Sequence, residues 1–283
     1  MSVLVFGATG KLGRLLLPEL QKRGVAAADI TAAGRKQEVL DGLAAEGYRT
    51  VQVELGDAEQ VRAAVAGHDQ VVLISGGEPT RLQQHQNVID AAKAAGAAHL
   101  YYTSGLRVDD PSFLLGADHK ATEDAIKASG LTWTILRNGW YIENYLQSMQ
   151  GAAQTGVFAA AVGDGRVAPA GRQDFAEALA AVVAGEGHDN RTYDLSGDRD
   201  YTYAELAEAM SEVLGKPVTY QAVPAEQYHG MLTGAGLDEG TAGFLVALDG
   251  SMGAGIMAHT GDDLARLTGH PTMSLVEGLR QGN

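Results

Sequence analysis

Short apolar runs alternate with amphipathic stretches along the first half of the chain, and this alternation restricts the fold more than any other feature. Strands of a parallel sheet are buried on both faces and read as apolar runs, whereas the helices that join them are apolar on one side only. The pattern predicts strands at 3–6, 30–33, 50–54, 70–75, 100–103 and 132–136. It predicts helices at 11–23, 36–46, 58–66, 81–95 and 117–129. We therefore expect an α/β fold, a Rossmann-like doubly wound parallel sheet.

The alternation loosens after residue 138. A glycine-rich stretch at 156–171 precedes a predicted helix at 174–184, a strand at 192–195, a helix at 203–214 and a strand at 218–223. We expect residues 1–138 and 160–200 to form the nucleotide-binding domain, and residues 139–159 and 201–283 to form a smaller α/β C-terminal substrate region. The glycine-rich residues 230–255 fit either helices with flexible joints or a mobile lid.

Composition excludes several classes of function. The 283 residues include no cysteine, which rules out disulfides, thiolate zinc sites and cysteine nucleophiles. A net charge of −14 argues against nucleic acid as a partner, because phosphate backbones bind clustered lysines and arginines. Acidic pairs such as Asp109-Asp110 lack histidines at ligand spacing, so no metal is expected. Without a signal peptide or a membrane-length apolar run, we expect a cytoplasmic protein that does not enter a membrane.

Three glycines, Gly7, Gly10 and Gly13, stand where the first strand must turn into the first helix. Glycine there lets backbone amides and the positive end of the helix approach a pyrophosphate. Glycines also occur in purely structural turns, and the spacing is not the G-x-G-x-x-G fingerprint. The position between strand and helix favours a dinucleotide site in the loop Gly7-Ala8-Thr9-Gly10-Lys11-Leu12-Gly13.

A basic residue, Arg35, follows the second strand, where an acidic residue would hold the ribose hydroxyls of NAD. An arginine can instead pair with a 2′-phosphate through charge-assisted hydrogen bonds. NADPH (NADP) is therefore the expected cofactor, and a solvated helix start is the alternative interpretation of Arg35.

Two further strand ends bear on the cofactor. Asp57, after the third strand, can accept a hydrogen bond from the adenine amino group or cap the helix that starts at Ala58. Ser75-Gly76-Gly77 ends the fourth strand, and small residues there leave room for the adenosine ribose and the nicotinamide side. A plain loop is the alternative for that corner.

The fifth predicted helix lacks the Tyr-x-x-x-Lys pair by which short-chain dehydrogenases exchange a proton with a carbinol. Leu115 stands at the tyrosine position and His119 at the lysine position. Alcohol oxidation and sugar epimerisation by that mechanism are therefore not expected. Hydride transfer to a quinone needs no enzyme acid at the transition state, since water can protonate the product later.

Five segments spread over nearly the whole chain carry a family resemblance. They are Gly7 to Gly13, Ala91 to Gly96, Tyr102-Thr103-Ser104, Leu136 to Tyr141 with Glu143-Asn144-Tyr145, and Leu267 to Thr272. Together they resemble the NmrA-like NADPH:quinone oxidoreductases, atypical short-chain dehydrogenases related to triphenylmethane dye reductases. The resemblance implies cofactor contacts from Gly10, Lys11, Leu12, Arg35, Ser75, Gly76, Gly77, Asn138, Gly139, Trp140, Tyr141, Glu143 and Arg172. Gly76 and Gly77 depart from the small hydroxyl residues expected at their positions.

Three residues are expected to serve catalysis. His119 resembles a histidine that these relatives keep on the same helix, where it would donate a hydrogen bond or a proton to the acceptor; a structural or solvated histidine is the alternative. The Asn138 amide can hydrogen-bond the nicotinamide carboxamide or the acceptor carbonyl. Tyr141, with Trp140, can form an aromatic acceptor slot, or both can belong to the core.

The resulting hypothesis is direct hydride transfer from NADPH to a quinone or a similarly flat conjugated acceptor. A non-catalytic NmrA-like regulator that senses dinucleotides is the main alternative, because loss of the Tyr-x-x-x-Lys pair fits both. An azo-dye or nitroaromatic reductase is a third. The sequence leaves open whether the chain forms a homodimer.

Overall fold

A seven-stranded parallel sheet forms the centre of the computed structural model, which describes residues 1–281. Its strands are β1 (Val3–Phe6), β2 (Ile30–Gly34), β3 (Arg49–Gln52), β4 (Gln70–Ile74), β5 (His99–Gly105), β6 (Trp133–Asn138) and β9 (Arg191–Leu195). They lie in the order β3-β2-β1-β4-β5-β6-β9, with every neighbouring pair parallel. The chain thus moves outward in both directions from β1 and β4, which confirms the predicted doubly wound sheet.

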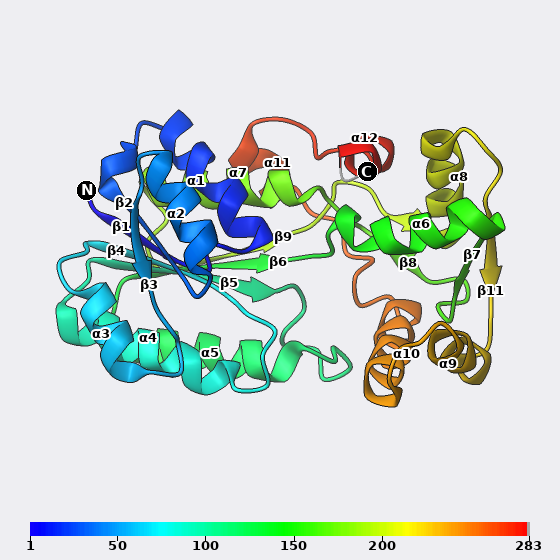
Figure 1. Cartoon of the computed structure of the whole chain (residues 1–283), viewed down its shortest axis with the longest axis horizontal. Coiled ribbons are helices and arrows are strands. Elements are labelled where there is room, and N and C mark those ends of the chain that lie inside the picture. Colours follow the sequence, from blue (N-terminus) through cyan, green and yellow to red (C-terminus); the bar gives the residue numbers. More distant parts are fainter. Residues whose placement is uncertain (282–283) are drawn as a thin grey trace.

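Helices cover both faces of this sheet (Figure 1). One layer contains α1 (Lys11–Lys22), α2 (Gln37–Ala45), α7 (Arg172–Ala184) and α11 (Asp263–Thr268). The other contains α3 (Ala58–Val65), α4 (Arg81–Ala95) and α5 (Gly116–Ala128). Each layer encloses its own hydrophobic cluster against the sheet, because strands such as VLVF at 3–6 bury side chains on both faces.

A smaller unit adjoins the carboxyl ends of β5 and β6 (Figure 1). Its strands form two pairs, parallel β7 (Val157–Ala160) with β11 (Thr219–Ala222) and antiparallel β8 (Arg166–Val167) with β10 (Tyr201–Thr202). Its helices are α6 (Leu146–Thr155), α8 (Tyr203–Leu214), α9 (Ala225–Gly234), α10 (Glu239–Gly253) and α12 (Leu275–Gln281). Short 3-10 helices η1 (Ala27–Asp29) and η2 (Ile142–Tyr145) complete the described chain. Helices α9 and α10 occupy most of residues 230–255. Flexible joints or a mobile lid in this stretch stay predictions.

The packing bears on where the two units divide. Phe158, Val162 and Val167 lie in the hydrophobic cluster of the smaller unit, together with Tyr203 and Met252. By contrast, α7 and β9 belong to the sheet and its helical layer. We therefore propose that the smaller unit also includes residues 160–167, which the sequence pattern had placed in the nucleotide-binding domain. Within residues 1–281, no helix has the length and apolar character needed to cross a membrane.

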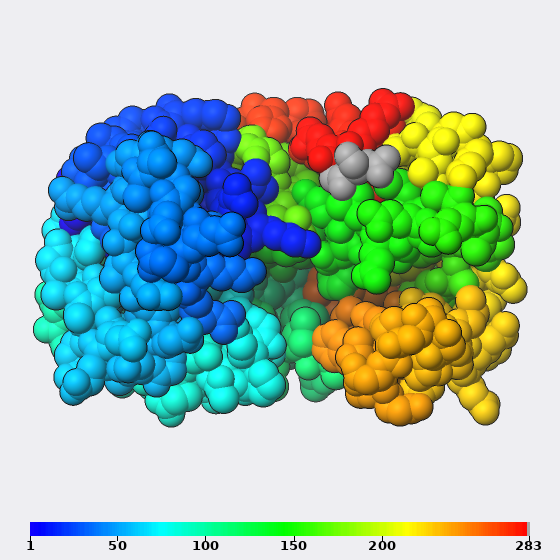
Figure 2. Space-filling model, viewed as in Figure 1, coloured from blue at the N-terminus to red at the C-terminus, as the bar shows by residue number. Residues whose placement is uncertain are grey.

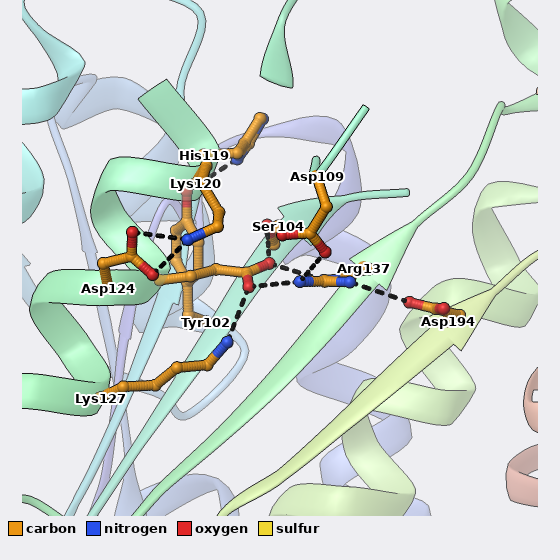
Figure 3. A network of polar contacts seen from close by, with 10 residues as sticks. Tyr102, Ser104, Asp109, His119, Lys120, Asp124, Lys127, Arg137 and Asp194 are labelled. Carbon is orange, nitrogen blue, oxygen red and sulfur yellow. Dashed lines mark hydrogen bonds and ion pairs between the residues drawn. The ribbon is translucent and has the colours of Figure 1, made fainter. Parts of the chain in front are cut away.

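A buried carboxylate, Glu123, ties α5 to the sheet (Figure 3). The guanidinium of Arg137, on β6, donates two hydrogen bonds of 2.8 Å to it, and the Ser104 hydroxyl, on β5, donates a third of 2.7 Å. Lys127 Nζ lies 3.0 Å from the second carboxylate oxygen. Burial raises the pKa of Glu123, but these donors outweigh burial and hold its pKa below the usual value. The network fixes the helix that carries His119 against the ends of two strands.

Replacing this carboxylate should destabilise the protein. Glu123→Ala leaves the largely buried Arg137 charge with only the half-exposed Asp109 and Asp194 as partners, so we expect the free energy of unfolding in urea at pH 7 to fall by about 3 kcal/mol. Asp124→Ala, on the same helix, removes only an exposed pair with Lys120 and should cost less than about 0.5 kcal/mol.

The loss of stability in Glu123→Ala should also depend on pH. Because the pKa of Glu123 is lower in the folded chain than in the unfolded chain, its contribution is present above the unfolded pKa of about 4.3 and is lost as the pH falls through the folded value. The gap in unfolding free energy between wild type and Glu123→Ala should therefore narrow in acid. A gap that stays constant from neutral to acid pH would contradict this interpretation.

Candidate functional site

A cavity of about 480 Å³ opens at the carboxyl ends of β1, β2 and β4, where the strand order reverses. The surface in Figure 2 is hollowed between the blue and cyan residues of the nucleotide-binding unit and the green residues that follow β6. The predicted site residues that line the cavity are Gly7, Thr9, Gly10, Lys11, Leu12, Gly13, Arg35, Ser75, Gly76, Gly77, Tyr141 and Arg172. Ligand sites of doubly wound folds lie at this reversal point.

The turn from β1 into α1 depends on two glycines. Gly7 has a φ of +85°, and its carbonyl accepts a hydrogen bond of 3.0 Å from the Gly10 amide. A Cβ on Gly13 would lie 2.6 Å from Ala8 Cα and closer still to the Gly7 carbonyl oxygen, so a side chain there would force α1 away from the turn.

The start of α1 fits a pyrophosphate. The helix begins at Lys11 with no side-chain cap from Gly10, and the first amides of an α-helix have no partner within the helix. Lys11, Leu12 and Gly13 all line the cavity. These amides, together with the positive end of the helix dipole, make the opening a suitable site for an anion.

Arg35 lies at the end of β2 and faces the same cavity. Its guanidinium forms an ion pair with Glu78, with 2.6 Å between Nη2 and Oε1. The Gln52 side chain donates a hydrogen bond of 3.0 Å to the Arg35 carbonyl and holds the backbone at this point. Gly34, which precedes Arg35, makes room for Thr9, because a Cβ on Gly34 would lie 2.5 Å from the Thr9 hydroxyl oxygen. Sequence reasoning overlooked both Gly34 and Glu78.

Asp57 acts as a helix cap in this structure. Its carboxylate accepts hydrogen bonds of 3.0 and 3.1 Å from the amides of Glu59 and Gln60, at the start of α3. It is not among the residues that line the cavity. The capping interpretation therefore accounts for its position, and a contact with adenine stays a prediction.

Tyr141 forms part of the cavity wall opposite the glycine loop. Its ring meets the Phe175 ring edge to face, with centroids 5.0 Å apart, and the Arg172 guanidinium lies 4.9 Å from its centroid. The Asn138 amide nitrogen donates a hydrogen bond of 3.1 Å to the Tyr141 hydroxyl. Three contacts therefore fix the orientation of this ring.

Two buried polar atoms near Tyr141 have no hydrogen-bond partner within residues 1–281. They are Asn138 Oδ1, an acceptor, and Trp140 Nε1, a donor. Buried polar groups normally have partners, so such atoms beside a cavity suit a ligand with complementary groups. The nicotinamide carboxamide carries both a donor and an acceptor, and its amide N–H is a suitable donor for Oδ1 of Asn138.

Two other predicted residues support the backbone of the site. The Glu143 carboxylate accepts hydrogen bonds of 2.9 and 3.1 Å from the Arg172 amide and thereby caps the start of α7. The Gly139 amide donates one of 2.7 Å to the Leu195 carbonyl. Four predicted residues are not among those that line the cavity: Asn138, Gly139, Trp140 and Glu143. Their direct contact with a cofactor stays a prediction.

His119 is buried on α5, outside the set of cavity-lining residues. Its Nδ1 and the Tyr102 hydroxyl share a hydrogen bond of 2.7 Å (Figure 3). Burial and the nearby Arg81 charge lower the pKa of His119 to about 4. Burial also raises the pKa of Tyr102, so both side chains are neutral near pH 7. Sequence reasoning did not single out Tyr102, whose role depends on a partner 17 residues away.

The chemistry of the site is limited by what these side chains offer. Leu115 occupies the N-cap position of α5 and packs with the smaller unit. With Leu115 and His119 at the two positions concerned, the described helix holds no tyrosine-lysine pair. No cluster of three or more potential metal ligands occurs in residues 1–281. The arrangement can bind a dinucleotide and shape an aromatic slot, and no histidine is among the described residues that line the cavity.

Comparisons with known proteins identify the family. A model described as NAD(P)H-binding matches residues 7–186, beginning at the glycine turn. Quinone oxidoreductase 2 of Escherichia coli is 39% identical over 278 residues, covering 98% of this chain and 97% of that protein. NAD(P)H azoreductase of Xenophilus azovorans is 27% identical over 276 residues, covering 97% and 96%.

Solved structures agree with these matches. The Escherichia coli quinone oxidoreductase complexed with NADPH superposes with a TM-score of 0.94 at 38% identity, covering 99% of each chain. Triphenylmethane reductase of Citrobacter sp. complexed with NADP(H) gives a TM-score of 0.95 at 32% identity, covering 100% of each chain. The predicted family resemblance is confirmed, and the chain belongs to the NAD(P)H-binding family as an NADPH-dependent oxidoreductase.

Proposed function

We propose that the protein transfers hydride from NADPH directly to a quinone or a similarly flat conjugated acceptor. One observation carries the proposal: the cavity is lined both by Arg35 and by an oriented aromatic wall at Tyr141, and the described helix α5 holds no tyrosine-lysine pair. Reduction of a quinone needs little proton help, because the hydroquinone oxygen is a weak base. The similar enzyme from Escherichia coli is named a quinone oxidoreductase, which supports this acceptor class.

The proposed roles follow from position. When bound, NADPH supplies the hydride. The amides of Gly10 to Gly13 hold the pyrophosphate, and Arg35 holds the 2′-phosphate. Asn138 Oδ1, buried without a partner in the described chain, accepts a hydrogen bond from the carboxamide. The Tyr141 ring, fixed by Phe175 and Arg172, forms the wall of the acceptor slot and excludes water.

His119 has a limited role in this proposal. With a pKa of about 4 it carries no positive charge at neutral pH, so it does not act as an imidazolium acid. We propose that it orients the acceptor side of the site as a neutral hydrogen-bonding group held by Tyr102.

Conjugated dyes are a second acceptor class. The azoreductase and triphenylmethane reductase relatives match nearly the full length of the chain, which supports dyes as acceptors for the same cavity. A regulator would bind NADPH and reduce nothing. A cytoplasmic location and a homodimer stay predictions.

Turnover with a panel of acceptors tests the proposed function. Loss of NADPH absorbance should be saturable with benzoquinones and naphthoquinones, and dyes of the azo and triphenylmethane types serve as the comparison. NADPH binding, measured separately by fluorescence, should accompany this turnover. Tight binding without turnover on any quinone or dye would contradict the enzyme and favour the regulator.

The low pKa of His119 predicts a flat pH profile. The rate of hydride transfer should vary little between about pH 6 and pH 8, because His119 stays neutral throughout this range. His119→Gln should lower the rate by about tenfold or less, the value of one hydrogen bond, without changing the profile. Tyr102→Phe should reproduce part of that loss. If the wild-type rate rose with protonation of a group near pH 6.5 and this rise vanished in His119→Gln, the neutral role would be wrong.

A further inference from the structure

The ion pair between Arg35 and Glu78 has no role in the function proposed above. Both side chains line the cofactor cavity, and Nη2 of Arg35 lies 2.6 Å from Oε1 of Glu78. They remain accessible, with 56% of the Arg35 side chain and 34% of the Glu78 side chain exposed. A ligand entering the cavity can therefore reach both members of the pair.

The loop after β4 is built to place this carboxylate. The Glu78 carbonyl accepts a hydrogen bond of 3.1 Å from the Arg81 amide, which anchors Glu78 just before α4. Its side chain folds back over Gly76, where an added Cβ would lie 2.5 Å from Oε2. The glycine at 76, which departs from the hydroxyl residues that the family resemblance implies, thus leaves space for the carboxylate.

A carboxylate and a phosphate compete for the same partner. Each presents oxygens that accept charge-assisted hydrogen bonds from a guanidinium, and Arg35 can bind either in a forked geometry. The 2′-phosphate that would pair with Arg35 must therefore displace Glu78 and then remain near its negative charge. A dinucleotide without that phosphate leaves the ion pair intact.

We propose that Glu78 is a specificity-determining residue whose carboxylate competes with the 2′-phosphate of NADPH for Arg35. The inference rests on the proposed binding of the 2′-phosphate by Arg35. Its consequence is that the protein discriminates NADPH from NADH less strongly than Arg35 alone would allow. Glu78 therefore sets how much NADH the enzyme accepts.

Glu54 provides a matched control. It is also an acidic residue that lines the cavity, beyond the end of β3, and no ion pair links it to Arg35 in the described chain. Neutralising Glu54 changes the overall charge of the cavity by the same amount as neutralising Glu78. A difference between the two variants then reports the competition for Arg35.

Fluorescence titration in the absence of any acceptor tests the proposal. Compared with the wild type, Glu78→Gln should bind NADPH and the fragment 2′,5′-ADP about 3–10-fold more tightly. In this variant Arg35 no longer has to give up an exposed ion pair before it binds the phosphate, and such pairs are worth about 1 kcal/mol. NADH and 5′-AMP should change by less than about twofold, and Glu54→Gln should not reproduce the gain. Melting temperatures would verify that each variant is folded.

The Arg35→Ala background separates competition from simple repulsion. Arg35→Ala itself should weaken the binding of NADPH and leave the binding of NADH almost unchanged. When Glu78→Gln is added to Arg35→Ala, the gain in the logarithm of NADPH affinity should be less than half of the gain that Glu78→Gln gives in the wild type. Equal gains in both backgrounds, an unchanged ratio of NADPH to NADH affinity, or weaker NADPH binding by Glu78→Gln would each overturn the proposal. Because no acceptor is present, these results are independent of whether the enzyme reduces quinones.

Discussion

The close approach between the Gly7-Ala8 backbone and the first turn of α1 is the constraint on which the site depends. Without side chains at Gly7 and Gly13, the helix can begin directly at the carboxyl end of β1. The first amides of α1 then face the cavity, and the remainder of the helix packs on α7 over the same face of the sheet. One tight turn thus sets the position of the anion site relative to β2 and β4, whose ends supply Arg35 and the Ser75 corner.

The opposite side of the cavity is held by different means. Glu123 and Arg137 join α5 to β5 and β6 through buried, charge-assisted hydrogen bonds, and Glu143 caps the start of α7 beside Arg172. Glu123 and Arg137 are paired with each other, and the Glu143 carboxylate is engaged by the backbone amide of Arg172. Together with the neutral His119, these contacts support the proposal that the site orients its ligands and leaves the reaction chemistry to the dinucleotide.

Sequence periodicity predicted the sheet well because its central strands, such as 3–6 and 70–74, are largely buried on both faces and therefore form apolar runs in the sequence. The glycine turn and Arg35 were also predictable, since their positions follow directly from the strand ends. Pairings set by tertiary structure were not. Arg137 on β6 meets Glu123 on α5, and Arg35 after β2 meets Glu78 in the loop after β4, because the fold brings together elements that are distant in the sequence.

Very short strands and single capping residues were also difficult to predict from the sequence. β8 spans only Arg166–Val167, too few residues for a periodic signal, so the sequence could not show that it pairs with β10 in the smaller unit. Asp57 follows a strand as an adenine-binding residue would, yet its carboxylate is engaged by the amides of α3. A local pattern could not separate these two roles, because each needs the same acidic residue at the same place.

If Asn138 and Tyr141 hold the nicotinamide as proposed, NADPH binds in one orientation, with one face of the nicotinamide toward the acceptor slot. The most direct test uses NADPH carrying deuterium on either the pro-R or the pro-S position of C4, with the NADP⁺ product analysed by mass spectrometry after reduction of a quinone. The account predicts that deuterium is lost completely from one labelled form and retained completely in the other. Partial loss from both forms would contradict it.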